Sequence, residues 1–117
     1  TRGVSPINDA EDISNAAAAG CHILIFTTGR GTPMGGALMP VLKLCGSPET
    51  CRIMADNIDL DTSPVVFGDV TVSTMADRLL TLVLDTIRGE KTAAERLGHM
   101  ELHLHIMRQK PHASRDC

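Results

Sequence analysis

Short apolar runs and amphipathic stretches alternate along this chain. The two clearest apolar runs cover residues 22–26 and 41–45, and turn-forming residues follow each of them. Runs of this length that are apolar nearly throughout are typical of strands buried in a parallel sheet. The pattern therefore predicts two strands, the first buried on both faces, with His22 as a buried histidine at its start.

Three longer stretches carry helical signals. Residues 9–19 are good helix formers that end at Gly20, and residues 48–55 follow Ser47 as a cap with a proline at the first helical position. Residues 73–88 repeat apolar side chains at helical spacing and predict the clearest amphipathic helix. Its expected inward side chains are Met75, Leu79, Leu82, Val83 and Ile87, with Asp77, Arg78 and Arg88 outside.

Weaker signals fill the remaining segments. Thr92 and Glu95 form the pattern of a capping box, which predicts a short helix that Gly98 closes. Residues 65–67 are interpreted as either a short strand or a buried loop, and residues 101–107 alternate like a strand.

Strands that alternate with helices predict an α/β fold. The expected architecture is a three-layer Rossmann-like domain with a short, mostly parallel sheet, and it covers residues 9–108. Residues 1–8 have the composition of a linker, and residues 109–117 that of a disordered tail.

Composition narrows the choice of partners. The 117 residues carry a formal net charge of −3 and only two aromatic side chains, without a basic stripe, so nucleic acid is not an expected partner. No apolar run reaches the roughly 20 residues of a membrane span, so no membrane contact is expected. The four cysteines form no CxxC pair, which favours a cytoplasmic location, with Cys45 and Cys51 as small core residues.

The first predicted strand is followed directly by Thr27-Thr28-Gly29-Arg30-Gly31-Thr32-Pro33. Open α/β sheets bind ligands at the carboxyl ends of their strands, so this loop is the first candidate site. Glycines let backbone N–H groups approach an anion, and an arginine grips a carboxylate or phosphate with two hydrogen bonds. A glycine-rich turn without function is the alternative interpretation.

Several segments carry a resemblance in the same order along the chain. They are Ile25-Phe26-Thr27-Thr28-Gly29-Arg30-Gly31-Thr32-Pro33, Pro40-Val41-Leu42-Lys43-Leu44-Cys45-Gly46, Met54-Ala55-Asp56-Asn57-Ile58-Asp59, and Gly89-Glu90-Lys91-Thr92-Ala93-Ala94-Glu95 followed by Gly98-His99-Met100-Glu101. Together they resemble the carboxyl-terminal part of the altronate and galactarate dehydratase family, which includes sulfolactate sulfo-lyases.

The resemblance implies a lyase that removes water from a sugar acid and leaves a 2-keto-3-deoxy acid, with a divalent metal, iron by preference. A sulfo-lyase that expels sulfite from a small 2-hydroxy acid is the alternative within the enzyme class. A non-catalytic module that binds an anion is the alternative outside it. Family members carry further regions, so the chain is expected to act within a larger enzyme and to bind the metal mainly through residues elsewhere.

An elimination beside a carboxylate needs a carboxylate clamp, a base, and an acid or metal for the leaving group. Arg30 suits the clamp, and the substrate-binding loop around it comprises Thr27, Thr28, Gly29, Gly31 and Thr32. Lys43, in the middle of an apolar strand, is either a catalytic ammonium or a side chain that reaches out from an edge strand.

Acidic and histidine side chains supply the remaining candidates. Asp56 and Asp59 are candidates for acid/base chemistry or metal binding, as is Asp61, with a solvated turn as the alternative. His99, His103 and His105 are set aside as a metal site, because the resemblance places ordinary apolar residues there. The metal ligands stay unknown. The expected partners are a small acid and the remaining domains or a subunit of the same enzyme, with a homodimer left open.

Overall fold

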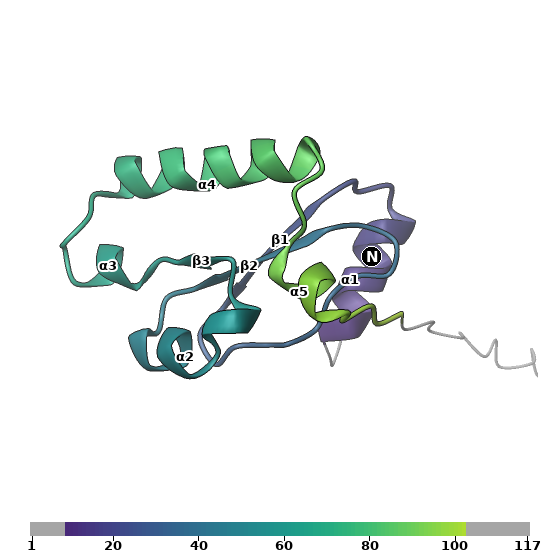
Figure 1. The fold of residues 1–117 in the computed structure, drawn as a ribbon, viewed down its shortest axis with the longest axis horizontal. Coiled ribbons are helices and arrows are strands. Elements are labelled where there is room, and N and C mark those ends of the chain that lie inside the picture. The colour runs from purple at the N-terminus through teal and green to yellow at the C-terminus, as the bar shows by residue number, and fades with distance from the viewer. Residues whose placement is uncertain (1–8, 103–117) are drawn as a thin grey trace, which may run out of the picture.

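A computed structural model describes residues 9–102. Three parallel strands form the sheet in the order β1 (Leu24–Thr28), β2 (Val41–Cys45) and β3 (Leu60–Asp61). Strands and helices alternate along the chain, as Figure 1 shows. The predicted α/β class and the predicted parallel sheet are therefore confirmed.

The helices lie on both faces of this sheet. They are α1 (Asp9–Ala18), α2 (Pro48–Ile53), the 3₁₀ helix η1 (Ala55–Asn57), α3 (Ser63–Val66), α4 (Val72–Ile87) and α5 (Ala93–Leu97). Helix α4 runs along one side of the sheet, and α1, α2 and α5 lie on the other (Figure 1). Within residues 9–102, no helix has the length and apolar character needed to cross a membrane.

The central strand β2 is buried along its whole length, and its side chains alternate between the two layers. Val41 packs with Ile13 of α1 and with Met39 in the main apolar cluster. Leu42 and Leu44 face the opposite layer, where they line the hollows beneath α4. The three-layer arrangement follows directly from this period of two.

Strand β1 differs from the expectation of burial on both faces. It begins at Leu24 and continues through Thr28, and every second residue is exposed, with Ile25 at 43%. The reason is its place in the sheet: β1 is an edge strand, and the leucines below α4 belong to β2 and β3. The expected burial of His22 is also wrong, because this residue lies before the strand and is exposed.

Two segments that sequence reasoning left uncertain are now defined. Residues 63–66 form helix α3, so both interpretations of residues 65–67, a strand or a buried loop, are wrong. Pro64 occupies an early helical position, where its missing N–H costs nothing. Of the predicted strand over residues 101–107, Glu101 makes a single parallel bridge to Gly36, and the residues from 103 onward lie outside the described part. The predicted linker and tail lie outside it too.

Helix α4 confirms the predicted amphipathic helix and corrects one residue of it. Thr71 caps its start by accepting the Thr74 N–H, and Met75 is buried against the sheet. Ile87, expected to point inward, is 68% exposed. The apolar positions of α4 span a wider arc than the sheet covers, so Leu80 and Leu84 are exposed as well.

Candidate functional site

The carboxyl ends of the three strands meet at one edge of the sheet. In register, Thr28 of β1 pairs with Cys45 of β2, and Cys45 pairs with Asp61 of β3. Gly46 N–H donates to the Thr28 carbonyl at 3.4 Å, and Thr62 N–H donates to the Cys45 carbonyl at 2.8 Å. Each strand therefore delivers its following loop to the position at which open α/β sheets bind ligands.

A tight turn opens the candidate loop after β1. The Gly31 N–H donates to the Thr28 hydroxyl oxygen at 3.0 Å, and Gly31 has a φ of +80°. A Cβ at this position would collide with Met54 Sδ and lie 2.8 Å from Thr50 Cγ2. Only glycine combines this backbone conformation with such close packing against α2. Gly29, by contrast, has open space around it.

The side chains of the loop point to different environments. Thr27 and Arg30 are exposed, and Arg30 makes no ion pair or hydrogen bond with any residue in 9–102. Thr32 is only 4% exposed, and its hydroxyl accepts the Met34 N–H at 3.4 Å. Within residues 9–102, the loop therefore presents an unpaired guanidinium to solvent, while the buried Thr32 stabilises the turn.

Helix α2 attaches this loop to the second βα unit. Ser47 caps α2 by accepting the Thr50 N–H, with Pro48 at the first helical position, as the sequence predicted. The Thr50 hydroxyl then donates to the Gly29 carbonyl at 2.8 Å. Sequence reasoning did not assign this role to Thr50, because no local pattern pairs it with Gly29, 21 positions earlier.

Lys43 lies beneath the loop at 0% exposure. Its Nζ donates to the Pro33 carbonyl at 3.1 Å. Burial lowers the pKa of this ammonium, and the carboxylates of Asp59 and Glu101 oppose that shift. The alternative of a side chain reaching out from an edge is wrong, because β2 is the central strand. Lys43 thus meets the loop at its far end, three residues beyond Arg30.

Asp59 and Asp56, two of the three aspartates predicted as acid/base or metal residues, occupy different positions. Asp59 Oδ2 accepts the Lys43 backbone N–H at 2.8 Å, and Asp59 Oδ1 accepts the Ala93 N–H at 2.6 Å. The Asp56 side chain is exposed in η1 and makes no hydrogen bond or ion pair with another side chain or backbone group of residues 9–102. The structure therefore brings Asp59 next to Lys43 but does not join Asp56 to this network.

Glu101 is a residue that sequence reasoning missed. Its Oε2 accepts the Gly35 N–H at 2.8 Å, and its Oε1 lies 3.7 Å from His99 Nδ1. Gly35 itself has no room for a side chain, because a Cβ would collide with the His99 carbonyl. No local pattern pairs residues 66 positions apart, so this contact belongs to the tertiary structure alone.

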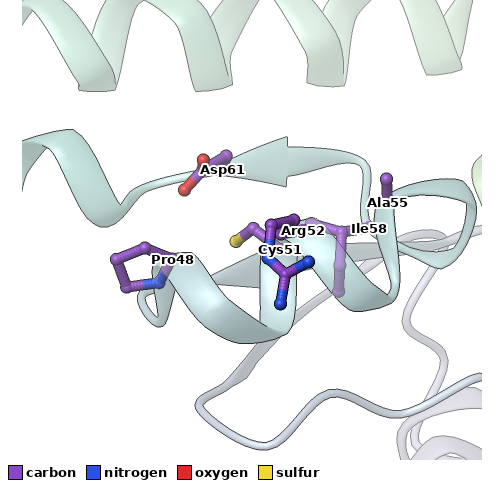
Figure 2. Close-up of a pocket in the computed structure, with 6 residues that line it drawn as sticks. All are labelled: Pro48, Cys51, Arg52, Ala55, Ile58 and Asp61. Atoms are coloured by element: carbon purple, nitrogen blue, oxygen red, sulfur yellow. The ribbon is translucent and has the colours of Figure 1, made fainter.

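A second hollow lies at the same edge, between α2 and β3. It has a volume of 310 Å³ and is lined by Pro48, Cys51, Arg52, Ala55, Ile58 and Asp61. Figure 2 shows Cys51 of α2 opposite Asp61 of β3. Burial first, and then the neighbouring Asp61 and Cys45, raise the pKa of the Cys51 thiol to about 12. Cys45 and Cys51 are both buried and free, which confirms them as small core residues.

Asp61 accepts the Ser63 N–H at 2.8 Å. Although partial burial alone would raise the pKa of Asp61, hydrogen bonds from Ser63 and from the Cys51 thiol outweigh it, so the pKa is lowered. The Asp61 carboxylate therefore acts as a hydrogen-bond acceptor for Ser63 and for the Cys51 thiol.

The candidate site contains few metal-binding side chains close to one another. Within residues 9–102, no three His, Cys, Asp or Glu side chains are close enough together to hold a metal ion. A catalytic metal commonly takes three protein ligands. The described residues therefore do not form a metal site of their own.

The sequence places the chain in a family. Residues 3–110 match the family described as D-galactarate/altronate dehydratase, C-terminal. The chain therefore belongs to this family, as its C-terminal domain, and the resemblance seen in the sequence is confirmed.

Named relatives agree with this assignment. The chain is 40% identical over 92 residues to (2R)-sulfolactate sulfo-lyase subunit beta of Chromohalobacter salexigens, an alignment that covers 79% of this chain and 24% of that protein. It is 33% identical over 98 residues to altronate dehydratase of Escherichia coli, an alignment that covers 84% of this chain and 19% of that protein. It is 30% identical over 87 residues to galactarate dehydratase (L-threo-forming) of the same organism, where the alignment covers 74% of this chain and 17% of that protein. The chain spans less than a quarter of each of these relatives.

Proposed function

We propose that this chain is the carboxylate-binding domain of a cytoplasmic lyase that eliminates water from a sugar acid and leaves a 2-keto-3-deoxy acid. The observation that carries the proposal is Arg30, an exposed guanidinium at the carboxyl edge of a parallel sheet that has no partner among residues 9–102. An arginine in this position grips a planar carboxylate through two hydrogen bonds. The dehydratases among the relatives support an acidic substrate.

The loop around Arg30 completes the proposed binding site. Gly29 is exposed beside the guanidinium, whereas Gly31 shapes the turn and its N–H is already bonded to the Thr28 hydroxyl. The Thr27 and Thr28 hydroxyls offer further hydrogen bonds to sugar hydroxyls. Thr32 contributes by fixing the turn, since its side chain is buried. Binding of the substrate carboxylate here orients the acid for the elimination and leaves its reacting carbons free for groups elsewhere in the enzyme.

The candidate acid/base residues differ in their positions. Lys43 and Asp59 are adjacent and lie beneath the loop, so they are proposed to support it there, whereas Asp56 lies outside their network. The divalent metal, iron by preference, is proposed to be held mainly by regions of the larger enzyme beyond this chain. The domain alone is accordingly proposed to bind an acid without turning it over.

A second candidate is a subunit of a sulfolactate sulfo-lyase. The observation in its favour is the identity of 40% to the sulfo-lyase subunit, against 33% and 30% to the two Escherichia coli dehydratases. Both activities start from a 2-hydroxy acid, so the same clamp serves either substrate. The choice between them depends on the group that leaves, not on Arg30.

Titration calorimetry tests the proposal. The chain is titrated with galactarate, altronate, sulfolactate and inorganic phosphate, as wild type, Arg30→Ala and Arg78→Ala, the last a matched exposed arginine on α4, away from the loop. We expect one organic acid to bind, Arg30→Ala to weaken binding by about tenfold or more, and Arg78→Ala to leave it unchanged. Binding that survives Arg30→Ala would refute the clamp. Phosphate as the tightest ligand would favour an anion-binding module.

A further inference from the structure

Side chains hold the connection between β1 and β2 in place. Parallel neighbours are usually joined through a helix, but residues 29–40 contain none. Two side chains contact residues 33–35 of this connection. Lys43 Nζ donates to the Pro33 carbonyl at 3.1 Å, and Glu101 Oε2 accepts the Gly35 N–H at 2.8 Å. The segment is therefore tied both to the central strand and to the chain after α5.

We propose that Lys43 and Glu101 are positioning residues, which together fix residues 33–35 and thereby set where Arg30 presents its guanidinium. The functional consequence rests on the proposed function of Arg30. The geometry of the two contacts does not.

The opposite charges of Lys43 and Glu101 orient the peptide segment between them. The positive ammonium of Lys43 faces a carbonyl oxygen, and the negative carboxylate of Glu101 faces an amide hydrogen two residues further on. Hydrogen bonds with one ionised partner are shorter and stronger than neutral ones. The two charges do not form a direct ion pair within the described chain. They are joined through the peptide segment, which is held in the one orientation that satisfies both.

Burial strengthens the attachment. Lys43 is fully buried, and the Pro33 carbonyl is the single acceptor that residues 9–102 offer to its Nζ. Removing that acceptor would leave the buried ammonium without a hydrogen-bond acceptor in the described chain, which is unfavourable. Gly35 is packed against α5 as well, since a Cβ there would lie 2.7 Å from Ala94 Cβ. The segment therefore has little freedom to leave its place.

The attachment reaches Arg30 through a short and constrained stretch of chain. Thr32 joins the two parts, because its hydroxyl accepts the Met34 N–H. Gly31, next to Arg30, packs against Met54 so closely that it leaves no room for a side chain. Because only Gly31 and Thr32 separate Arg30 from Pro33, we expect a displacement of residues 33–35 to shift Arg30. Misplacement by about 1 Å is enough to weaken a binding or catalytic contact strongly.

Hydrogen exchange of single amides tests the geometry without any ligand. The comparison uses wild type, Lys43→Met, Lys43→Arg and Glu101→Gln, with the Leu82 amide of α4 as an internal reference for global unfolding. We expect the Gly35 amide to exchange about tenfold faster or more in Lys43→Met, relative to Leu82, although Lys43 does not bond to that amide. Lys43→Arg should restore part of the protection. Unchanged Gly35 exchange in Lys43→Met and in Glu101→Gln would overturn the proposal.

A double-mutant cycle tests the consequence for ligand binding. Lys43→Met and Glu101→Gln should each weaken acid binding in the Arg30 protein, and this loss should largely vanish in the Arg30→Ala background. Equal losses in both backgrounds would contradict a role through Arg30. If Lys43→Met does not fold, Glu101→Gln decides alone. If Arg30→Ala has no effect while Gly35 exchange responds as expected, the clamp fails and the positioning contact stands.

Discussion

The carboxylate of Asp59 accepts the backbone N–H of Lys43 at 2.8 Å. The Asp59 N–H in turn donates to the Lys43 carbonyl at 2.9 Å, just before β3 begins its pairing with β2. The Asp59 side chain thus extends the hydrogen-bond ladder between β2 and β3 by one bond. Through its other oxygen the same carboxylate holds the first residue of α5.

Asp59→Ala removes the acceptor of two backbone N–H groups that belong to different elements. We expect the free energy of unfolding to fall by about 2 kcal/mol or more, because hydrogen bonds to a charged group are stronger than neutral ones and the freed amides are partly buried. Asp56→Ala is the matched control, with an expected change within about 0.5 kcal/mol. Urea unfolding measures both. Equal losses in the two variants would contradict this role of Asp59.

Gly31→Ala tests the turn at the start of the loop. The positive φ and the collision with Met54 Sδ together should lower the free energy of unfolding by about 2 kcal/mol. Gly29→Ala, two residues earlier, meets no atom within 4 Å and should change stability by less than about 0.5 kcal/mol. Thermal or urea unfolding of the pair gives the comparison. A harmless Gly31→Ala would mean that the loop adopts another conformation.

Met75→Ala tests how α4 packs on the sheet. Met75 is 6% exposed and lines the apolar hollow beneath the helix, so its truncation should cost about 2 kcal/mol or more. Leu80 lies on the same helix at 57% exposure, and Leu80→Ala should change the free energy of unfolding by no more than about 0.5 kcal/mol. The ordering of the two losses is the result to check. A larger loss for Leu80→Ala would place the other side of α4 against the sheet.

Alkylation of the thiols tests the environment of Cys51. With a pKa of about 12, only about one thiol in ten thousand is ionised at pH 8, and the thiolate is the species that reacts. In a Cys117→Ser background, mass spectrometry after iodoacetamide treatment should find the exposed Cys21 modified well before Cys51. The protection of Cys51 should be lost in urea. Rapid modification of folded Cys51 would contradict both its burial and its raised pKa.

Much of the fold could be predicted because its signals are local. The buried run over residues 41–45, the cap at Ser47 and the capping box at Thr92 each depend on neighbours within one turn or strand, and each is present in the structure. The predictions were wrong where the conformation or burial of a segment depends on contacts with distant parts of the chain. The burial of β1 depended on its being an edge strand, and residues 65–67 depended on how the chain turns after β3.

The sequence by itself determined the class of the fold, the family and the loop with Arg30, because strand periodicity, turn chemistry and the order of motifs are written along the chain. Only the tertiary structure decided that Lys43 is buried beneath that loop and that Glu101, 58 positions further along, ties down its far end. Contacts between distant residues depend on how the sheet and helices pack in three dimensions. No local pattern of charge or hydrophobicity encodes them.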